Sequence, residues 1–333
     1  MRTPQEFSAE LLRIDSGAEC ERIQAAIRRQ VFEELRRKGA VVGMSGGVDS
    51  STAAALAARA LGPGRVLGLL MPESESSGDS LRLAKLAAES IGIPTVVENI
   101  GPILASAGCY RRRDEAIRTL IPDYDETYKC KIVLSDVVSQ SAYPIFSVVV
   151  RSPQGITTRT RLSLDVYLAV VAATNFKQRV RKMMEYYYAD RHVYAVVGTP
   201  NLLEYDQGFF VKNGDGSADL KPIAHLYKTQ VYELARHLGL PDEICTRPPT
   251  TDTYPLEQSQ QEFFFSLPYD KLDLCLYARD HGWAPESVAA AIALTPEQVA
   301  RAYNMIDAKR RAARYLHAPP LLVETLAGAQ TAS

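Results

Sequence analysis

The fold is decided by the stretch Ala40-Val41-Val42-Gly43-Met44-Ser45-Gly46-Gly47-Val48-Asp49-Ser50-Ser51. Its first five residues form a short apolar run, which is typical of a buried parallel strand. The adjacent glycines let the backbone turn tightly, and the alanine-rich segment at 51–61 predicts a helix. A strand that turns directly into a helix presents backbone N–H groups and the helix N-terminus to an anion. The stretch therefore predicts a site for nucleotide phosphates.

Strands and helices alternate around this stretch. A capping box of Ser16 and Glu19 is expected to begin the first helix. The elements expected in this half are a helix at 16–38, strands at 40–44, 66–71 and 95–97, and helices at 51–61 and 80–91. This order predicts an α/β, Rossmann-like fold, with a parallel sheet flanked by helices on both faces and ligands at the carboxyl ends of the strands.

The second half is expected to complete the same domain with a helical C-terminal portion. The expected elements are two helices within 162–190, a strand at 194–197, and helices at 225–238, 268–281 and 295–315. Residues 246–266 are rich in proline and polar residues and predict a mobile loop that orders over the bound nucleotide. The predicted organisation is N-terminal helices at 1–38, a nucleotide-binding domain at 39–270 with a long insertion near 100–160, a helical portion at 271–320 and a tail at 321–333.

Composition excludes several classes of protein. The 333 residues carry 38 Lys+Arg against 39 Asp+Glu, so the net charge of -1 gives no general attraction for nucleic acid. No segment approaches the roughly 20 apolar residues of a membrane span, so no membrane partner is expected. The five cysteines are scattered without C-x-x-C, which excludes a zinc ribbon and a dithiol motif and indicates reduced thiols in a cytoplasmic protein.

The chemistry of the side chains sharpens the phosphate hypothesis. Ser45 and Ser50 add hydroxyl donors, whereas Asp49 would repel a bare phosphate and so suggests a bridging Mg²⁺. The Walker A pattern G-x-x-x-x-G-K is absent. Further along, Arg179 suits bidentate recognition of oxygen atoms, and Lys228 can act as a point charge on a reacting phosphate.

The Ser45–Ser50 string resembles the loop of the ATP pyrophosphatases, and motifs of the second half resemble the NAD synthetase family. Those motifs are Asn175-Phe176-Lys177-Gln178-Arg179-Val180-Arg181, Gly198-Thr199, Glu204, Gly208-Phe209-Phe210-Val211-Lys212, Gly214-Asp215-Gly216-Ser217-Ala218-Asp219, Leu226-Tyr227-Lys228-Thr229-Gln230 and Pro249-Thr250-Thr251-Asp252. They recur in the family's order and spacing, which makes the resemblance specific.

The resemblance implies a reaction and a set of site residues. The reaction is the ATP-dependent amidation of deamido-NAD to NAD⁺ through an acyl-adenylate, with ammonia as nitrogen donor, and it releases AMP and pyrophosphate. The resemblance also implies that the enzyme is a homodimer. The implied ATP-binding residues are Gly43, Ser45, Gly46, Gly47, Val48, Asp49, Ser50, Thr199, Lys228 and Thr250. Asp49, Lys228 and Thr250 are the implied catalytic residues, and Asp49 and Glu204 are the implied Mg²⁺ ligands. The implied contacts to deamido-NAD come from Arg179, Lys212, Asp219 and Lys309.

Several alternatives remain open from the sequence. The long insertion and the run Ala308-Lys309-Arg310 depart from the family pattern, which leaves room for a paralogue that amidates or ligates another carboxylate. A tRNA-modifying pyrophosphatase and a non-enzymatic nucleotide-binding module are more distant alternatives. Only 39 residues precede Ala40, so we expect no glutaminase domain there, and ammonia is expected to arrive free or from a separate glutaminase subunit.

Overall fold

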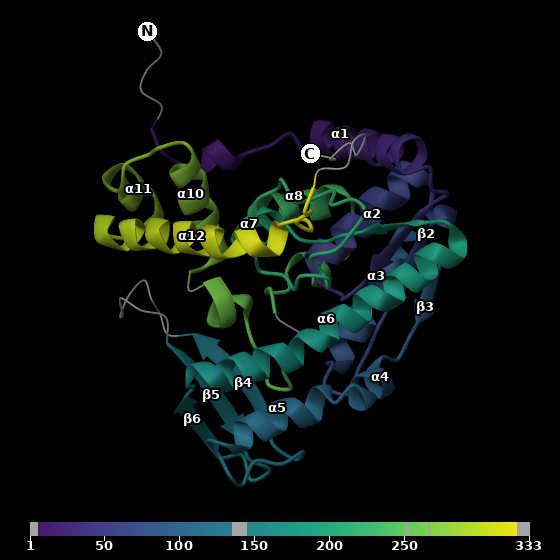
Figure 1. The fold of residues 1–333 in the computed structure, drawn as a ribbon. Helices are drawn as coiled ribbons and strands as arrows, with labels where there is room; N and C mark the ends of the chain where they lie inside the picture. Colours follow the sequence, from purple (N-terminus) through teal and green to yellow (C-terminus); the bar gives the residue numbers. More distant parts are fainter. Residues whose placement is uncertain (1–5, 135–144, 251–252, 266, 325–333) are drawn as a thin grey trace.

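A four-stranded parallel sheet lies at the centre of the computed structural model, which describes residues 6–134, 145–250, 253–265 and 267–324 (Figure 1). The strand order is β3-β2-β1-β7, and both neighbours of β1 run parallel to it. The strands are β1 at Ala40–Gly43, β2 at Val66–Leu70, β3 at Thr95–Val97 and β7 at Ala195–Val197. The predicted α/β architecture is therefore confirmed.

Alternate residues of the central strands bury opposite faces of the sheet. Ala40 and Val42 belong to the apolar cluster on one face, whereas Val41 belongs to the cluster on the other. The first face is covered by α1 at Ser16–Arg28, α2 at Val48–Leu61, α3 at Gly78–Ile91 and α8 at Lys228–His237. The second face is covered by α4 at Gly101–Ser106, α5 at Cys109–Arg118 and α6 at Leu164–His192. Because both faces are buried, the strands read as continuous apolar runs.

The first helix begins at Ser16, as predicted, but its N-terminal cap and its C-terminal end differ from the prediction. Asp15 is the N-cap of α1, and its Oδ1 accepts the backbone N–H groups of Gly17 and Ala18, each at 3.0 Å. The predicted capping box of Ser16 and Glu19 is therefore wrong. The α-helix ends at Arg28, and a π-helical segment, Arg29–Glu34, follows it.

The two helices predicted within 162–190 form one continuous helix, α6, of 29 residues. Ser163 caps its start by accepting the N–H of Val166, and Val193 ends it in the left-handed conformation. At 1.5 Å per residue such a helix is roughly 44 Å long. It connects the insertion with the central sheet (Figure 1).

The insertion near 100–160 forms α4, α5 and a second, antiparallel sheet of order β4-β5-β6. Its strands are β4 at Lys129–Leu134, β5 at Phe146–Arg151 and β6 at Thr157–Arg161. Ile132 and Val148 pack against Ile117 of α5 and Val170 of α6 in a separate apolar cluster. No regular element was predicted there. The buried face of this sheet forms only when the flanking helices α5 and α6 pack against it, and the local sequence pattern does not show that packing.

The remaining helices are α7 at Leu202–Gln207, α9 at Asp242–Cys245, α10 at Tyr269–Asp280, α11 at Pro285–Ile292 and α12 at Pro296–His317. They pack mainly on other helices: α10, α11 and α12 pack together, α7 packs on α12, and α9 packs on α2 and α3. The sequence did not predict α11. Within 246–266, the segment Gln261–Phe265 is π-helical. In the described parts of the chain all five cysteines are free and buried, and no helix is long and apolar enough to cross a bilayer.

The N-cap of α1 gives a stability test. Asp15→Ala removes the acceptor of two N–H groups, so we expect the free energy of unfolding to fall by about 1 kcal/mol. Urea denaturation followed by circular dichroism measures this change. Ser16→Ala is the matched control and should stay within about 0.5 kcal/mol of wild type. An equal loss in both variants would contradict the assignment of Asp15 as the cap.

Candidate functional site

A cavity of about 680 Å³ opens where β1 and β7 end, and most of the predicted site residues line it. They come from the loop after β1, from α6, from the segment after β7, from α8 and from the 246–266 segment. The predicted residues that line the cavity are Gly43, Ser45, Gly47, Val48, Asp49, Ser50, Arg179, Thr199, Glu204, Lys212, Lys228 and Thr250. In the Pro249-Thr250-Thr251-Asp252 motif, Thr251 and Asp252 lie outside the described residues.

The loop after β1 forms a cup that its own serines hold in shape. The Ser45 hydroxyl accepts the N–H of Gly47 at 3.3 Å, and the Ser50 hydroxyl donates to the carbonyl of Gly47 at 3.2 Å. Gly46 lies under the cup with φ at +78°, and an added Cβ would be 2.6 Å from the carbonyl oxygen of Ser80. Only glycine fits there, because both the backbone conformation and the space exclude a side chain. The cup leaves the N-terminus of α2 facing the cavity, as expected of a phosphate site.

A buried ion pair lies beside the cup. The Lys228 ammonium, whose side chain is 1% exposed, pairs with the Asp49 carboxylate at the start of α2. Burial alone would lower the pKa of Lys228, but attraction to Asp49 and Glu204 outweighs it and the pKa lies above its usual value. The cavity therefore holds a charged lysine next to the cup.

Asn201 joins the two carboxylates of the site. Its side-chain N–H donates to Asp49 Oδ1 at 3.0 Å, and its side-chain oxygen accepts the N–H of Glu204 at 3.2 Å. The Glu204 carboxylate in turn accepts the N–H of Asn201 at 3.2 Å, which completes a capping box at the start of α7. The Asn-x-x-Glu spacing was the available sequence signal for this residue, which the sequence analysis did not name as a site residue.

Asp273 of α10 fixes the position of Lys228. Its carboxylate oxygens accept the backbone N–H of Lys228 at 3.3 Å and that of Thr229 at 2.8 Å. It therefore satisfies orphan N–H groups at the start of α8. No local pattern could reveal this contact, because 45 positions separate the first donor from its acceptor.

Glu204 is held in an unfavourable environment for a negative charge. Burial, together with the charge of Asp49, raises its pKa to about 8 despite the attraction of Lys228. Two carboxylates thus share one ammonium group. Carboxylate oxygens in a pair, with substrate phosphates completing the shell, are the usual protein ligands of Mg²⁺. The donor set of Asp49 and Glu204 therefore fits a magnesium ion.

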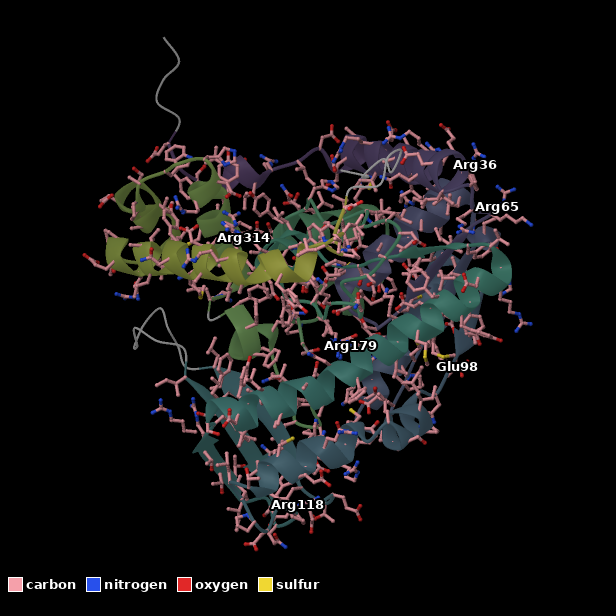
Figure 2. The ribbon with its side chains drawn as sticks, in the orientation of Figure 1. Arg36, Arg65, Glu98, Arg118, Arg179 and Arg314 are labelled. Atoms are coloured by element: carbon pink, nitrogen blue, oxygen red, sulfur yellow. The ribbon has the colours of Figure 1, made fainter. Side chains whose placement is uncertain are left out.

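Two predicted contacts to the acid substrate meet at the cavity wall. Figure 2 shows Arg179 on α6 near the middle of the molecule, and its Nε donates to the carbonyl of Lys212 at 3.3 Å. The Lys212 ammonium donates to the carbonyls of Tyr315 and Ala318 at 2.7 and 2.9 Å. Lys212 is thus held by hydrogen bonds at the end of α12. The two terminal nitrogens of Arg179, by contrast, make no hydrogen bond within the described residues.

Two other predicted contacts, and one glycine, do not line the cavity. Asp219 accepts the N–H of Val196 at 2.7 Å and lies beside β7. Lys309 lies with its ammonium 3.9 Å from the centroid of the Phe264 ring and donates to the Phe264 carbonyl, and burial lowers its pKa to about 7. Gly46 lies in the turn of the cup, against the carbonyl of Ser80. The implied substrate roles of Asp219 and Lys309 stay predictions.

Glu204 predicts a pH dependence of stability. Its folded pKa of about 8 exceeds its ordinary 4.5, so the folded state binds this proton more tightly than the unfolded state does. Stability from this group is therefore greatest below about pH 4.5 and falls as the pH rises to about 8. In EDTA, wild type should lose stability relative to Glu204→Gln across this range in denaturation curves. Glu33→Gln, at an exposed carboxyl, should parallel wild type. Parallel curves for Glu204→Gln would mean that Glu204 is ionised throughout.

Comparison with known proteins points to one family. The family model described as NAD synthase matches residues 19–120 and 138–313. The chain is 56% identical over 312 residues to the NH(3)-dependent NAD(+) synthetase of Mesorhizobium japonicum, covering 94% of this chain and 98% of that protein. It is 36% identical over 248 residues to the protein of the same name from Thermotoga maritima, covering 74% and 82% of the two chains.

Solved structures share the fold at low sequence identity. The NH3-dependent NAD synthetase of Campylobacter jejuni matches with a TM-score of 0.60 and 22% identity, covering 93% of this chain and all of that one. The NMN synthetase of Francisella tularensis matches with a TM-score of 0.64 and 20% identity, covering 93% and 99%. The family model and the closely similar full-length relatives together establish that the chain belongs to the NAD synthase family.

Proposed function

We propose that this chain amidates deamido-NAD with ammonia, consuming ATP and forming NAD⁺, AMP and pyrophosphate. The observation that carries the proposal is the convergence of the Ser45–Ser51 cup with Asp49, Glu204 and Lys228 in one cavity. The curated relatives that match nearly the whole chain are NH(3)-dependent NAD(+) synthetases. Five free, buried cysteines suit a reducing compartment, and we place the enzyme in the cytoplasm.

The first half-reaction activates the acid. A carboxylate oxygen of deamido-NAD attacks the α-phosphorus of ATP, the bond to the β-phosphate oxygen breaks, and pyrophosphate leaves with the electron pair. The cup supplies backbone N–H groups and serine hydroxyls to the phosphate oxygens, and Lys228 supplies a buried positive charge where negative charge develops. Thr199 and Thr250, which line the same cavity, contribute hydroxyl groups to ATP.

Asp49 and Glu204 would hold the magnesium ion. When bound, Mg²⁺ neutralises phosphate charge and orients the triphosphate. Asn201 fixes the orientation of both carboxylates through its three hydrogen bonds. Lys228 keeps the negative charge of the pair partly compensated before the ion arrives.

The second half-reaction forms the amide. Ammonia attacks the carbonyl carbon of the adenylate, AMP leaves with the oxygen–carbon bond electrons, and a proton is released. Arg179, with its free terminal nitrogens, contacts the pyrophosphate of deamido-NAD. Phe263 and Phe264 line the cavity and exclude water that would otherwise hydrolyse the adenylate.

We propose that the enzyme is a homodimer that pairs through α6. Exposed apolar side chains lie on one broad face of this helix: Leu164, Leu168, Met183 and Tyr187, each more than half exposed. Asp219 is also exposed and contacts Tyr186 of the same helix. Sedimentation equilibrium should give twice the chain mass of 36.7 kDa, and Met183→Asp should shift the mass toward the monomer. A monomeric wild type would contradict the proposal.

Activity with Asp49→Asn tests the proposed reaction. Purified wild type should convert ATP, Mg²⁺, ammonia and deamido-NAD into equal amounts of NAD⁺ and AMP. The variant removes a charge from the site, so kcat/KM should fall by at least about 100-fold. Asp79→Asn, at an exposed carboxyl of α3, is the matched control and should retain wild-type activity.

A substrate panel separates the proposed acid from its rivals. Nicotinic acid mononucleotide and simple aromatic carboxylates replace deamido-NAD in the same assay, with pyrophosphate release as readout. Release with another carboxylate but not with deamido-NAD would establish the paralogue alternative.

In the preceding assay, normal turnover by Asp49→Asn would refute the role assigned to Asp49.

A further inference from the structure

The segment 253–265 forms one wall of the nucleotide cavity. Thr253, Gln260, Phe263 and Phe264 all line the cavity. Water exclusion from the adenylate depends on the position of these residues. The contacts that hold the segment therefore bear directly on the proposed reaction, on which this inference rests.

Strand β4 holds the segment from one side. The carbonyl of Cys130 accepts the N–H of Leu256 at 3.2 Å, and the carbonyl of Ile132 accepts the side-chain amide of Gln258. Lys131 lies between them, and its ammonium donates to the carbonyl of Glu257 at 3.1 Å. β4 is an edge strand of its sheet. Its free edge would otherwise expose unpaired backbone groups, and the segment occupies it.

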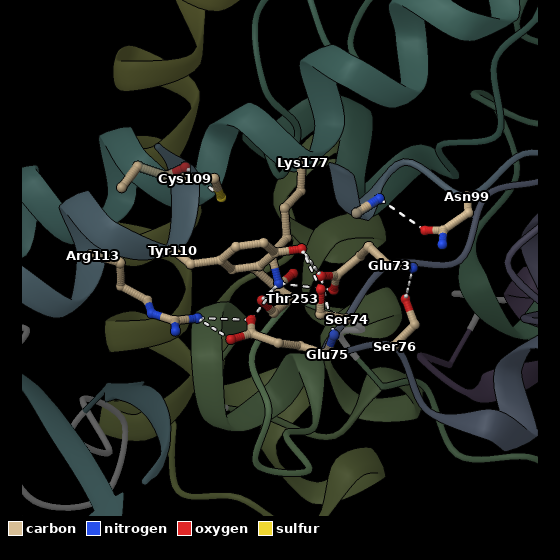
Figure 3. Close-up of polar contacts among 12 residues, drawn as sticks. Glu73, Ser74, Glu75, Ser76, Asn99, Cys109, Tyr110, Arg113, Lys177 and Thr253 are labelled. Atoms are coloured by element: carbon tan, nitrogen blue, oxygen red, sulfur yellow. Dashed lines mark hydrogen bonds and ion pairs between the residues drawn. The ribbon is translucent and has the colours of Figure 1, made fainter. Parts of the chain in front are cut away.

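Lys177 of α6 holds the segment from the other side (Figure 3). Its ammonium donates to the carbonyl of Thr253 at 2.8 Å and pairs with Glu73 at 3.0 Å and Glu75 at 2.7 Å. The Lys177 side chain is 1% exposed. Glu75 also binds Arg113 of α5 through two hydrogen bonds of 2.6 and 2.7 Å. A lysine buried this deeply is fixed in place, because leaving its carboxylate partners would cost several kcal/mol.

The two anchors, Lys177 and strand β4, differ in whether the family model covers them. Lys177 falls within the residues matched by the family model, whereas 121–137 lie outside both matched ranges. Strand β4, at Lys129–Leu134, therefore belongs to a part of the chain that the family model does not describe. The contacts from β4 to the cavity wall thus come from residues between the two matched ranges.

We infer that β4 is an accessory strand that positions the 253–265 segment over the nucleotide cavity before ATP binds. Lys131 and Gln258 are the positioning residues. The strand contributes no group to the reaction itself. Its effect is to keep the cavity wall in place, so that ammonia rather than water reaches the adenylate.

Hydrogen exchange on the substrate-free protein tests the positioning directly. Lys131→Met and Gln258→Leu each remove a hydrogen bond between β4 and the segment, so amide exchange in peptides spanning 253–265 should quicken roughly three- to ten-fold. Lys129→Met, two residues away on the same strand, is the matched control and should exchange at the wild-type rate. Lys131→Arg retains a donor and should restore protection. Peptides of β1 should stay unchanged in every variant.

The ratio of AMP to NAD⁺ formed tests the catalytic consequence. Wild type should give a ratio near 1, whereas Lys131→Met and Gln258→Leu should raise it to about 2 or more as the adenylate is lost to water. Unchanged exchange in 253–265 would overturn the inference, and faster exchange with an unchanged ratio would overturn its catalytic consequence. A wild type that forms no NAD⁺ would refute the proposed function, while the exchange comparison would still decide the role of β4.

Discussion

The charge balance among Asp49, Glu204 and Lys228 is the constraint on which the site depends. Two carboxylates and one ammonium group lie in a largely buried cavity, where an uncompensated charge is costly. Each is therefore fixed by a second contact. Asn201 donates its side-chain N–H to the Asp49 carboxylate and its backbone N–H to the Glu204 carboxylate, and Asp273 holds the backbone of Lys228. Burial, together with the negative charge of Asp49, raises the pKa of Glu204.

The parallel sheet makes this arrangement possible. β1 and β7 are neighbours and run in the same direction, so the residues that follow each strand meet at one edge. Asp49 follows β1, whereas Asn201 and Glu204 follow β7. Asp49 and Asn201 are 152 positions apart in the chain, yet they form a hydrogen bond at the carboxyl edge of the sheet. The C-terminal helices then complete the site, because α10 supplies the carboxylate that caps α8.

A second buried ionic network also reaches the cavity wall. Lys177, Glu73, Glu75 and Arg113 bring together α5, α6 and the loop after β2, and through Thr253 they reach the cavity wall. The insertion adds β4 to the same wall. We therefore propose that the residues at the carboxyl edge of the parallel sheet carry the chemistry, and that β4 helps to position one wall of the cavity.

Local glycines, short apolar runs and ordered motifs were enough to predict the strand–turn–helix cup, the parallel sheet and twelve of the residues that line the cavity. The sequence by itself did not predict the continuity of α6 or the β4-β5-β6 sheet, whose buried face forms only when α5 and α6 fold against it. Nor did it identify Asn201, Asp273 or Lys177 as residues that position the site. Only the tertiary structure decided these points, because a buried polar group must find its partner in space, and these partners lie between 44 and 152 positions away in the chain.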